Sequence, residues 1–310
     1  MPARVRVFMN ERSGGCAGRR GEVEAAFRES GLRCEVTSLR PRMDVAKLVR
    51  EAARRPETLV VAAGGDGTIS AVASAMAGSG APMGVLAMGT LNHFAKDLGL
   101  PAALMDEAKV IAEGEARSVD LGEVNGRFFV NNSSVGFYPG MVLHRERLKK
   151  VGWNKWLSLL VASARAFVRF KHISVCVSVP GEERMMRMTP FVFVGNNEYC
   201  MEGSEAGTRK KLDAGKLYLY MAPGATRRSL LRLTFAALMR RVHEVQQDPH
   251  FESYCVEEFT VDLRRRVSHV SLDGEIVRLK GPLQYRIRPG ALKVMAPVPV
   301  VSPVVEELSA

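Results

Sequence analysis

The chain has 310 residues, of which 46% are hydrophobic and 25% are charged, and its formal net charge is +11. This length allows two ordinary domains, each with its own core. The longest apolar run, residues 157–164, is far shorter than the about 20 residues of a membrane-spanning helix, and no apolar stretch of signal-peptide length opens the chain. The five cysteines are scattered and show no C-x-x-C spacing, which disfavours a disulfide framework or metal cluster and indicates a cytoplasmic protein. The positive charge suits an anionic partner, whether nucleic acid, an acidic membrane or a polyphosphate.

The first third of the chain alternates predicted strands and helices. One of the strands, 58–63, is apolar throughout, as expected for a parallel strand covered on both faces. The alternation predicts a doubly wound sheet, with ligands at the carboxyl ends of its strands. The predicted strands are 4–9, 34–39, 58–63 and 83–87, and the helices lie around Val23 and Phe27 and over 45–53, 68–77 and 101–113.

The pattern changes near residue 120. Asn125-Gly126, flanked by the segments 118–124 and 127–132, predicts a hairpin. Further short β runs predict a largely antiparallel second domain, interrupted by helical segments at 145–171 and 226–247. We expect domains at 1–122 and 123–290, with the tail 291–310 returning to the first through a strand at 292–296. The further β runs are 173–179, 191–194, 217–221, 259–263, 267–272 and 284–288.

The sharpest motif is a glycine-rich turn at 64–68, between an apolar strand and a helix. Glycines let the backbone approach phosphate oxygens, and the following helix directs unpaired N–H groups at anions. An acid inside such a turn indicates Mg²⁺ between Asp66 and the phosphates. The alternative is that Asp66 merely caps the helix. The residues of this predicted phosphate site are Gly64, Gly65, Asp66, Gly67 and Thr68.

Two further loops follow equivalent strands and predict the rest of a nucleotide cleft. The loop 10–15 offers backbone N–H groups, and the loop 89–95 offers hydroxyl and amide contacts. Either loop alone commonly just turns the chain. The candidate nucleotide-binding residues in them are Asn10, Ser13, Gly14, Gly89, Thr90 and Asn92.

Asp273-Gly274-Glu275 is the second constellation. Taken alone, Asp-Gly is more often a hairpin turn than a catalytic base. Phosphoryl transfer, however, needs a group to accept the acceptor's proton beyond positioning and charge neutralisation, which favours Asp273. Asp120 and Asp213 are further candidate acids.

These motifs together resemble the bacterial soluble diacylglycerol kinase-like lipid kinases, relatives of the eukaryotic diacylglycerol, sphingosine and ceramide kinases. Gly-Gly-Asp-Gly-Thr alone is shared with NAD kinases, but its combination with Gly-Thr-x-Asn and a late Asp-Gly-Glu is specific to the lipid kinases. The resemblance runs nearly end to end, through 10–14, 64–68, 89–95, 119–122, 131–136, 212–217 and 273–275.

The resemblance implies an ATP-dependent lipid kinase with an N-terminal NAD kinase/diacylglycerol kinase-like nucleotide domain, a C-terminal β-sandwich and an active site between them. ATP phosphates would lie at 10–14, 65–68 and Thr90. Asp273 would take the proton of the lipid hydroxyl beside Glu275, and Asp66 and Asp120 would organise the catalytic Mg²⁺ through water.

Three departures from the family pattern matter. Glu11 stands where the family often has Pro, and His93 where many members have Asp. Ala214 replaces the second acid of Leu-Asp-Asp-Gly, a ligand of a structural Mg²⁺. Only backbone carbonyls such as those of Lys211 and Lys216 then remain for that metal.

The predicted helical segments at 145–171 and 226–247 carry arginines and lysines among apolar residues, and Trp153 and Trp156 lie in the first. Such helices suit an anionic membrane surface, although they also pack against domains. We expect the protein to associate peripherally with the inner membrane face and to bind a lipid and not nucleic acid. The oligomeric state is left open, with a homodimer as one alternative. The alternatives are a polar-substrate kinase of the NAD kinase type and a catalytically weak, nucleotide-dependent binder of membranes or nucleic acid.

Overall fold

The computed structural model describes residues 4–12, 15–136, 172–200, 207–226, 229 and 251–298. Apart from residues 226 and 229, the two segments expected to be helical and membrane-facing lie outside this part of the chain. No helix among the described residues combines the length and apolarity needed to cross a membrane.

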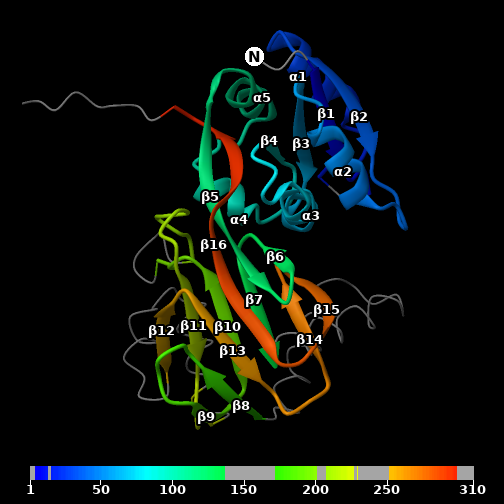
Figure 1. The fold of residues 1–310 in the computed structure, drawn as a ribbon. Coiled ribbons are helices and arrows are strands. Elements are labelled where there is room, and N and C mark those ends of the chain that lie inside the picture. The colour runs from blue at the N-terminus through cyan, green and yellow to red at the C-terminus, as the bar shows by residue number, and fades with distance from the viewer. Residues whose placement is uncertain are drawn as a thin grey trace, which may run out of the picture.

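The N-terminal part is a doubly wound α/β unit, as predicted (Figure 1). Its strands pair in parallel in the order β2 (Arg33–Ser38), β1 (Arg4–Met9), β3 (Thr58–Gly64) and β4 (Pro82–Ala87). The helices are α1 (Arg20–Glu29), α2 (Val45–Ala53), α3 (Asp66–Met76), α4 (His93–Asp97) and α5 (Leu104–Glu113).

Alternation along the buried strand β3 explains why helices cover both faces of this sheet. Val60 and Ala62 belong to the core that includes residues of α2 and α3, such as Val49 and Ile69. Val61, between them, belongs to a separate core that includes residues of α1 and α5. A strand whose successive side chains enter two cores must be apolar throughout.

The predicted hairpin around Asn125-Gly126 is confirmed, with β5 (Glu115–Val124) paired antiparallel to β6 (Arg127–Phe129). Both turn residues have positive φ, 47° and 77°, as a tight two-residue hairpin turn requires. The second strand is shorter than predicted, because β7 (Asn132–Gly136) pairs in a different sheet.

The C-terminal part is a β-sandwich, as predicted. One layer is a six-stranded antiparallel sheet. The other layer is the part of the ten-stranded sheet that lies beyond the N-terminal unit. Phe259 and Tyr285 stack at 4.9 Å in the core between them. The six-stranded sheet has the order β12 (Glu252–Val256), β11 (Leu217–Met221), β10 (Phe191–Asn196), β7, β14 (Val267–Leu272) and β15 (Glu275–Lys280); the other layer contains β13 (Glu258–Asp262), β8 (Ile173–Ser178) and β9 (Met185–Thr189).

The long strand β16 (Leu283–Ala296) runs through both parts of the molecule (Figure 1). Its first half pairs with β13, its second half pairs in parallel with β4 through Lys293 and Val294, and it pairs with β5 along most of its length. A register irregularity between Arg288 and Leu292 separates the two halves. The sequence pattern predicts these halves as two separate strands, 284–288 and 292–296. The domain boundaries at 122 and 290 stay a prediction.

Candidate active site

Three loops at the carboxyl ends of β1, β3 and β4 are packed backbone to backbone. A Cβ on Gly89 would lie 2.6 Å from the Cα of Gly65, and a Cβ on Gly15 would lie 1.8 Å from the carbonyl oxygen of Met88. The N–H of Met88 donates to the carbonyl of Gly64 at 2.9 Å. The structure thus brings the predicted loops to one sheet edge, and glycine is required where they touch. Ser13 and Gly14 lie outside the described residues.

Asp66 does not cap its own helix, because Gly65 is the N-cap of α3 and makes no side-chain cap. The Asp66 carboxylate instead accepts the N–H groups of Asn92 at 3.1 Å and His93 at 2.8 Å, where α4 begins. This acid therefore ties the start of α3 to the neighbouring loop and α4.

Asn92 closes the loop that begins at Gly89. Its backbone is left-handed, with φ of 52°. Its side-chain Oδ1 accepts the N–H of Gly89 at 2.9 Å, while its Nδ2 donates to the carbonyl of Ala87 at 3.0 Å. Thr90, inside this closed loop, is exposed, whereas Thr68 is buried against Gly64. Asn10 makes a local turn, its Oδ1 accepting the N–H of Arg12 at 3.2 Å.

Asp273 forms the β14–β15 hairpin turn and also faces the N-terminal unit. It has φ of 47° and precedes Gly274 with φ of 86°. Burial raises the pKa of this carboxyl, and its hydrogen bonds offset part of that rise. Its four donors are the hydroxyl of Ser70 on α3 at 2.5 Å and the N–H groups of Val130, Asn131 and Asn132 at 2.8, 2.7 and 3.0 Å.

Glu275 lies over the first turn of α3. Its Oε1 would be 3.5 Å from a Cβ on Gly67. Burial, and then the nearby Asp273 carboxylate, raise the pKa of Glu275, while Arg127 lowers it. Both acids of the Asp-Gly-Glu motif therefore contact the helix that begins at Asp66.

Asp120 is held in a different set of contacts. It is buried, and its carboxylate accepts hydrogen bonds from Asn197 at 3.2 Å, Gly215 at 2.7 Å and Gly290 at 2.8 Å. These partners join β5 to the 212–216 loop and to the irregularity in β16, and they share nothing with the partners of Asp66. A link between Asp120 and the catalytic Mg²⁺ stays a prediction.

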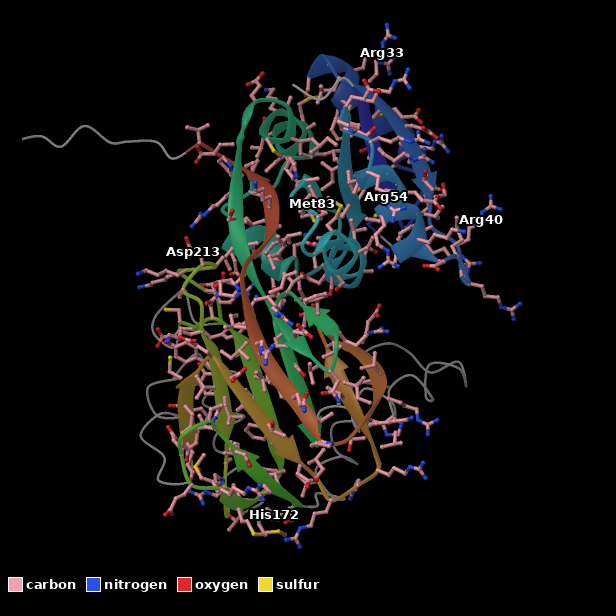
Figure 2. All side chains as sticks on the ribbon, viewed as in Figure 1. Arg33, Arg40, Arg54, Met83, His172 and Asp213 are labelled. Carbon is pink, nitrogen blue, oxygen red and sulfur yellow. The ribbon has the colours of Figure 1, made fainter. Side chains whose placement is uncertain are left out.

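The predicted structural metal loop wraps the same acid. The Lys216 carbonyl accepts the N–H of Asn197 at 3.0 Å, and that of Leu212 accepts the N–H of Asp120 at 2.7 Å. Asp213, labelled in Figure 2, is exposed. Among the described residues, no three His, Cys, Asp or Glu side chains gather as ligands of a metal. The Lys211 and Lys216 carbonyl site stays a prediction.

Sequence reasoning missed three residues of this site. Ser70 is one helical turn after Asp66, so helical spacing could have placed it on the same face of α3. Asp97 and Arg209 form an ion pair with Nε–Oδ2 of 2.8 Å. They are 112 residues apart, and no sequence motif joins them.

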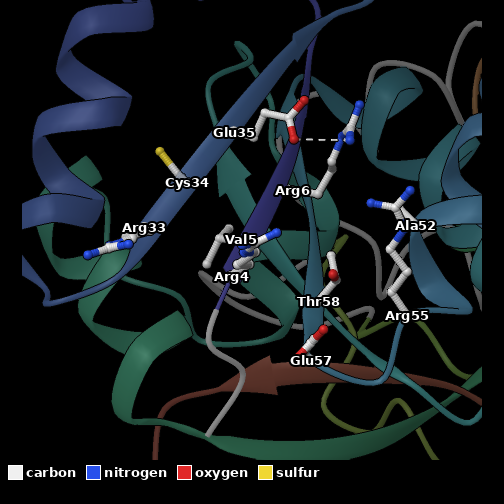
Figure 3. A pocket seen from close by; sticks show the side chains of 10 residues that line it. All are labelled: Arg4, Val5, Arg6, Arg33, Cys34, Glu35, Ala52, Arg55, Glu57 and Thr58. Carbon is white, nitrogen blue, oxygen red and sulfur yellow. Dashed lines mark hydrogen bonds and ion pairs between the residues drawn. The ribbon is translucent and has the colours of Figure 1, made fainter.

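A separate cavity of about 470 Å³ lies at the opposite, amino ends of β1–β3 (Figure 3). Its lining includes Arg4, Arg33 and Arg55, and Arg6, which pairs with Glu35 at 3.1 Å. It shares no residue with the loops above.

Comparison of the whole fold with solved structures defines its class. It matches a diacylglycerol kinase structure from Bacillus anthracis str. Sterne with a TM-score of 0.66 and 16% identity, over 97% of this chain and 98% of that one. An NAD kinase from Archaeoglobus fulgidus, solved in complex with ATP, matches with a TM-score of 0.53 and 14% identity, over 94% and 93% of the two chains. At these identities the likeness establishes the fold.

Sequence comparison identifies the family. The model of the diacylglycerol kinase catalytic domain matches residues 4–124, and that of the YegS C-terminal NAD kinase beta sandwich-like domain matches residues 143–296. The chain belongs to the diacylglycerol kinase-like lipid kinase family.

Among curated relatives, a "Diacylglycerol kinase" of Bacillus subtilis is 33% identical over 138 residues, which are 43% of this chain and 46% of the relative. A "Probable lipid kinase YegS-like" of Pseudomonas aeruginosa is 39% identical over 132 residues, 41% of this chain and 43% of the relative. The chain thus spans a little under half the length of these relatives.

Proposed function

We propose that this protein is an ATP-dependent kinase that transfers the γ-phosphoryl group to the hydroxyl of diacylglycerol or a related lipid. The observation that carries the proposal is the 2.5 Å hydrogen bond between Ser70 on α3 and Asp273. It sets a carboxylate of the β-sandwich beside the helix whose N-terminus follows the glycine-rich turn. A nucleotide turn and a candidate base on facing domains are what in-line transfer from ATP to a second substrate requires.

The N-terminal loops fit a bound triphosphate. The start of α3 offers backbone N–H groups to an anion. The loops at 64–67 and 89 meet through the backbones of Gly65 and Gly89, with no side chain between those two residues. Asp66 fits as a carboxylate partner of Mg²⁺, because each of its oxygens accepts one N–H and keeps a second lone pair. In kinases Mg²⁺ binds one or two carboxylates and the phosphates, and it neutralises charge during transfer.

The chain's own groups then account for the proton. As the lipid hydroxyl oxygen forms its bond to the γ-phosphorus, the bond from that phosphorus to the bridging oxygen of ADP breaks. The hydroxyl proton passes to Asp273 as the Ser70 hydroxyl gives up its hydrogen bond, because each oxygen of that carboxylate already accepts two. The raised pKa of Asp273 makes it a better proton acceptor than an ordinary carboxylate. Glu275 adds a second acid beside the first turn of α3.

A row of side chains next to Asp273 supports an apolar acceptor. Ser271 pairs with Ser134, which pairs with Phe193, which pairs with Tyr220, so the four share one face of the six-stranded sheet. Phe193 and Tyr220 lie with ring centroids 6.0 Å apart, and Tyr220 stacks on Phe251 at 5.8 Å. This aromatic face leads away from the turn that carries Asp273, which suits a lipid better than a dinucleotide.

A labelled-phosphate assay tests the proposal. The protein is incubated with γ-labelled ATP and Mg²⁺, with diacylglycerol in mixed micelles or with NAD, and the product is identified by mass. We expect a labelled lipid and no labelled dinucleotide. Label on NAD alone would instead assign the polar-substrate activity, and label on neither would favour a catalytically weak binder.

A further inference from the structure

A buried ion pair links the two halves of the candidate site. The Nε of Arg209 lies 2.8 Å from Oδ2 of Asp97, and the side chains are 0% and 3% exposed. The other carboxylate oxygen of Asp97 accepts the backbone N–H of Arg209 at 3.1 Å. Asp97 ends α4, and Arg209 belongs to the loop before β11.

The remaining donors of the Arg209 guanidinium go to the segment between β6 and β7 and to its neighbour β10. Nη1 donates to the carbonyls of Val130 at 2.7 Å and Asn196 at 3.0 Å, and Nη2 donates to Oδ1 of Asn131 at 2.7 Å. The guanidinium also lies over the ring of Tyr199, 5.7 Å from its centroid. A planar fork with this many fixed partners holds the segment in one place.

The segment that Arg209 holds is the one that binds Asp273. The N–H groups of Val130 and Asn131 donate to the Asp273 carboxylate, while Arg209 binds the carbonyl of the first residue and the side chain of the second. At the other end of the pair, α4 begins at His93, whose N–H donates to Asp66. One helical turn and one ion pair therefore connect the two carboxylates of the site.

We propose that Arg209 and Asp97 are positioning residues that fix Asp273 relative to the phosphate loops, an inference that rests on the proposed function. Neither side chain reaches solvent, and neither is assigned contact with the reacting atoms. Their contribution is to the geometry of transfer, so their loss lowers kcat while ATP is still bound.

The decisive variant removes both charges together, as Asp97→Leu with Arg209→Met. Replacing a buried ion pair with apolar residues of similar size commonly preserves stability. Arg209→Met also removes the donor to the carbonyls of Val130 and Asn196, so kcat is read together with Tm. We expect kcat to fall about 10–100-fold, with the KM for ATP within about threefold of wild type. The control for the substitutions themselves is Arg187→Met with Glu252→Leu, a partly exposed pair with Nε–Oε2 of 3.0 Å that shares no residue with the site.

A double variant with wild-type kcat and an unchanged Tm would overturn the proposal. If the double variant unfolds, Arg209→Lys decides the question, because lysine keeps the charge but lacks the planar fork. A fall in kcat at an unchanged Tm supports the positioning role, and wild-type kcat refutes it.

Hydrogen exchange separates this inference from the proposed kinase activity. The amides of 130–132 are measured with and without ATP and Mg²⁺, in wild type and Arg209→Lys. Protection that rises with ATP in wild type and not in the variant shows coupling, even if no acceptor is phosphorylated. Equal protection changes in both proteins refute the coupling.

Discussion

At the scale of single residues, the Asp66 carboxylate has two roles, one structural and one proposed for metal binding. It holds the N–H groups of Asn92 and His93, and we propose that it also faces Mg²⁺. Asp66→Ala removes both contributions, so Mg-ATP use should weaken by at least about 10²-fold, the scale of losing a preorganised charge contact. Steady-state kinetics over a range of ATP concentrations checks this. Unchanged kinetics would reject the cleft around this residue.

Gly89 tests the contact between the loops at 64–68 and 89–95. A Cβ there would lie 2.6 Å from both the Cα of Gly65 and Oδ1 of Asn92, so Gly89→Ala must push the loops apart. We expect a stability loss of about 1–3 kcal/mol and weaker ATP binding, measured by denaturant unfolding and calorimetry. Gly21→Ala is the matched control, since nothing lies within 4 Å of a Cβ at that position in α1. Equal effects of the two substitutions would contradict the argument.

At the scale of elements, α5 carries a buried acid beneath the end of β4. Glu107 accepts the N–H of Ala87 at 3.0 Å, and burial raises its pKa from 4.5 to about 7, against smaller opposing effects of that N–H and Arg19. The folded state thus holds this proton more tightly than the unfolded state. The stabilisation is complete below about pH 4.5 and is lost as the pH rises through about 7.

Glu107→Gln should remove that pH dependence while keeping an acceptor for Ala87. Between pH 5 and pH 8, the free energy of unfolding of wild type should fall by about 1–3 kcal/mol relative to the variant. Denaturant titrations at the two pH values measure this difference. Parallel pH profiles for the two proteins would show that the Glu107 carboxyl is not perturbed.

Elements with a clear apolar pattern could be predicted, including the edge strand β2, and most of the missed strands lie at sheet edges. Predicted and observed bounds agree for α2, β11 and β14. The missed strands β9, β12 and β15 lie at sheet edges, where one side of the strand has no neighbour and burial leaves little periodicity. The missed strand β7 is central in the six-stranded sheet, and its sequence, Asn-Ser-Ser-Val-Gly, lacks the apolar pattern of a strand. α5 begins three residues after Pro101, because the sequence signal marks the region of a helix start and not the capping residue.

The candidate site divides in the same way. Local motifs predicted Asp66, the glycines and Asp273, because the turns that they form depend on neighbouring residues. The partners of Asp120 and the Arg209–Asp97 pair depend on contacts between distant segments, which no local pattern encodes.

At the scale of the whole molecule, the net charge of +11 and the basic segments at 145–171 and 226–247 bear on where the protein works. We propose peripheral binding to the anionic inner membrane face, at about 1 kcal/mol for each basic side chain near the surface. Cosedimentation should show binding to vesicles with anionic lipid, weak binding to zwitterionic vesicles, and loss at high salt. Equal binding to both vesicle types, or preferential binding to DNA, would contradict this proposal.

The whole account depends on one arrangement. ATP binds at the turn that contains Asp66, and Asp273 of the other domain accepts the proton of the lipid hydroxyl that ATP phosphorylates. Transfer of label from γ-labelled ATP to diacylglycerol by wild type and Asp273→Asn, with ATP binding measured on both, tests it most directly. We predict labelled lipid from wild type, none from the variant, and ATP affinities within about threefold of each other. Wild-type transfer by Asp273→Asn would contradict the account.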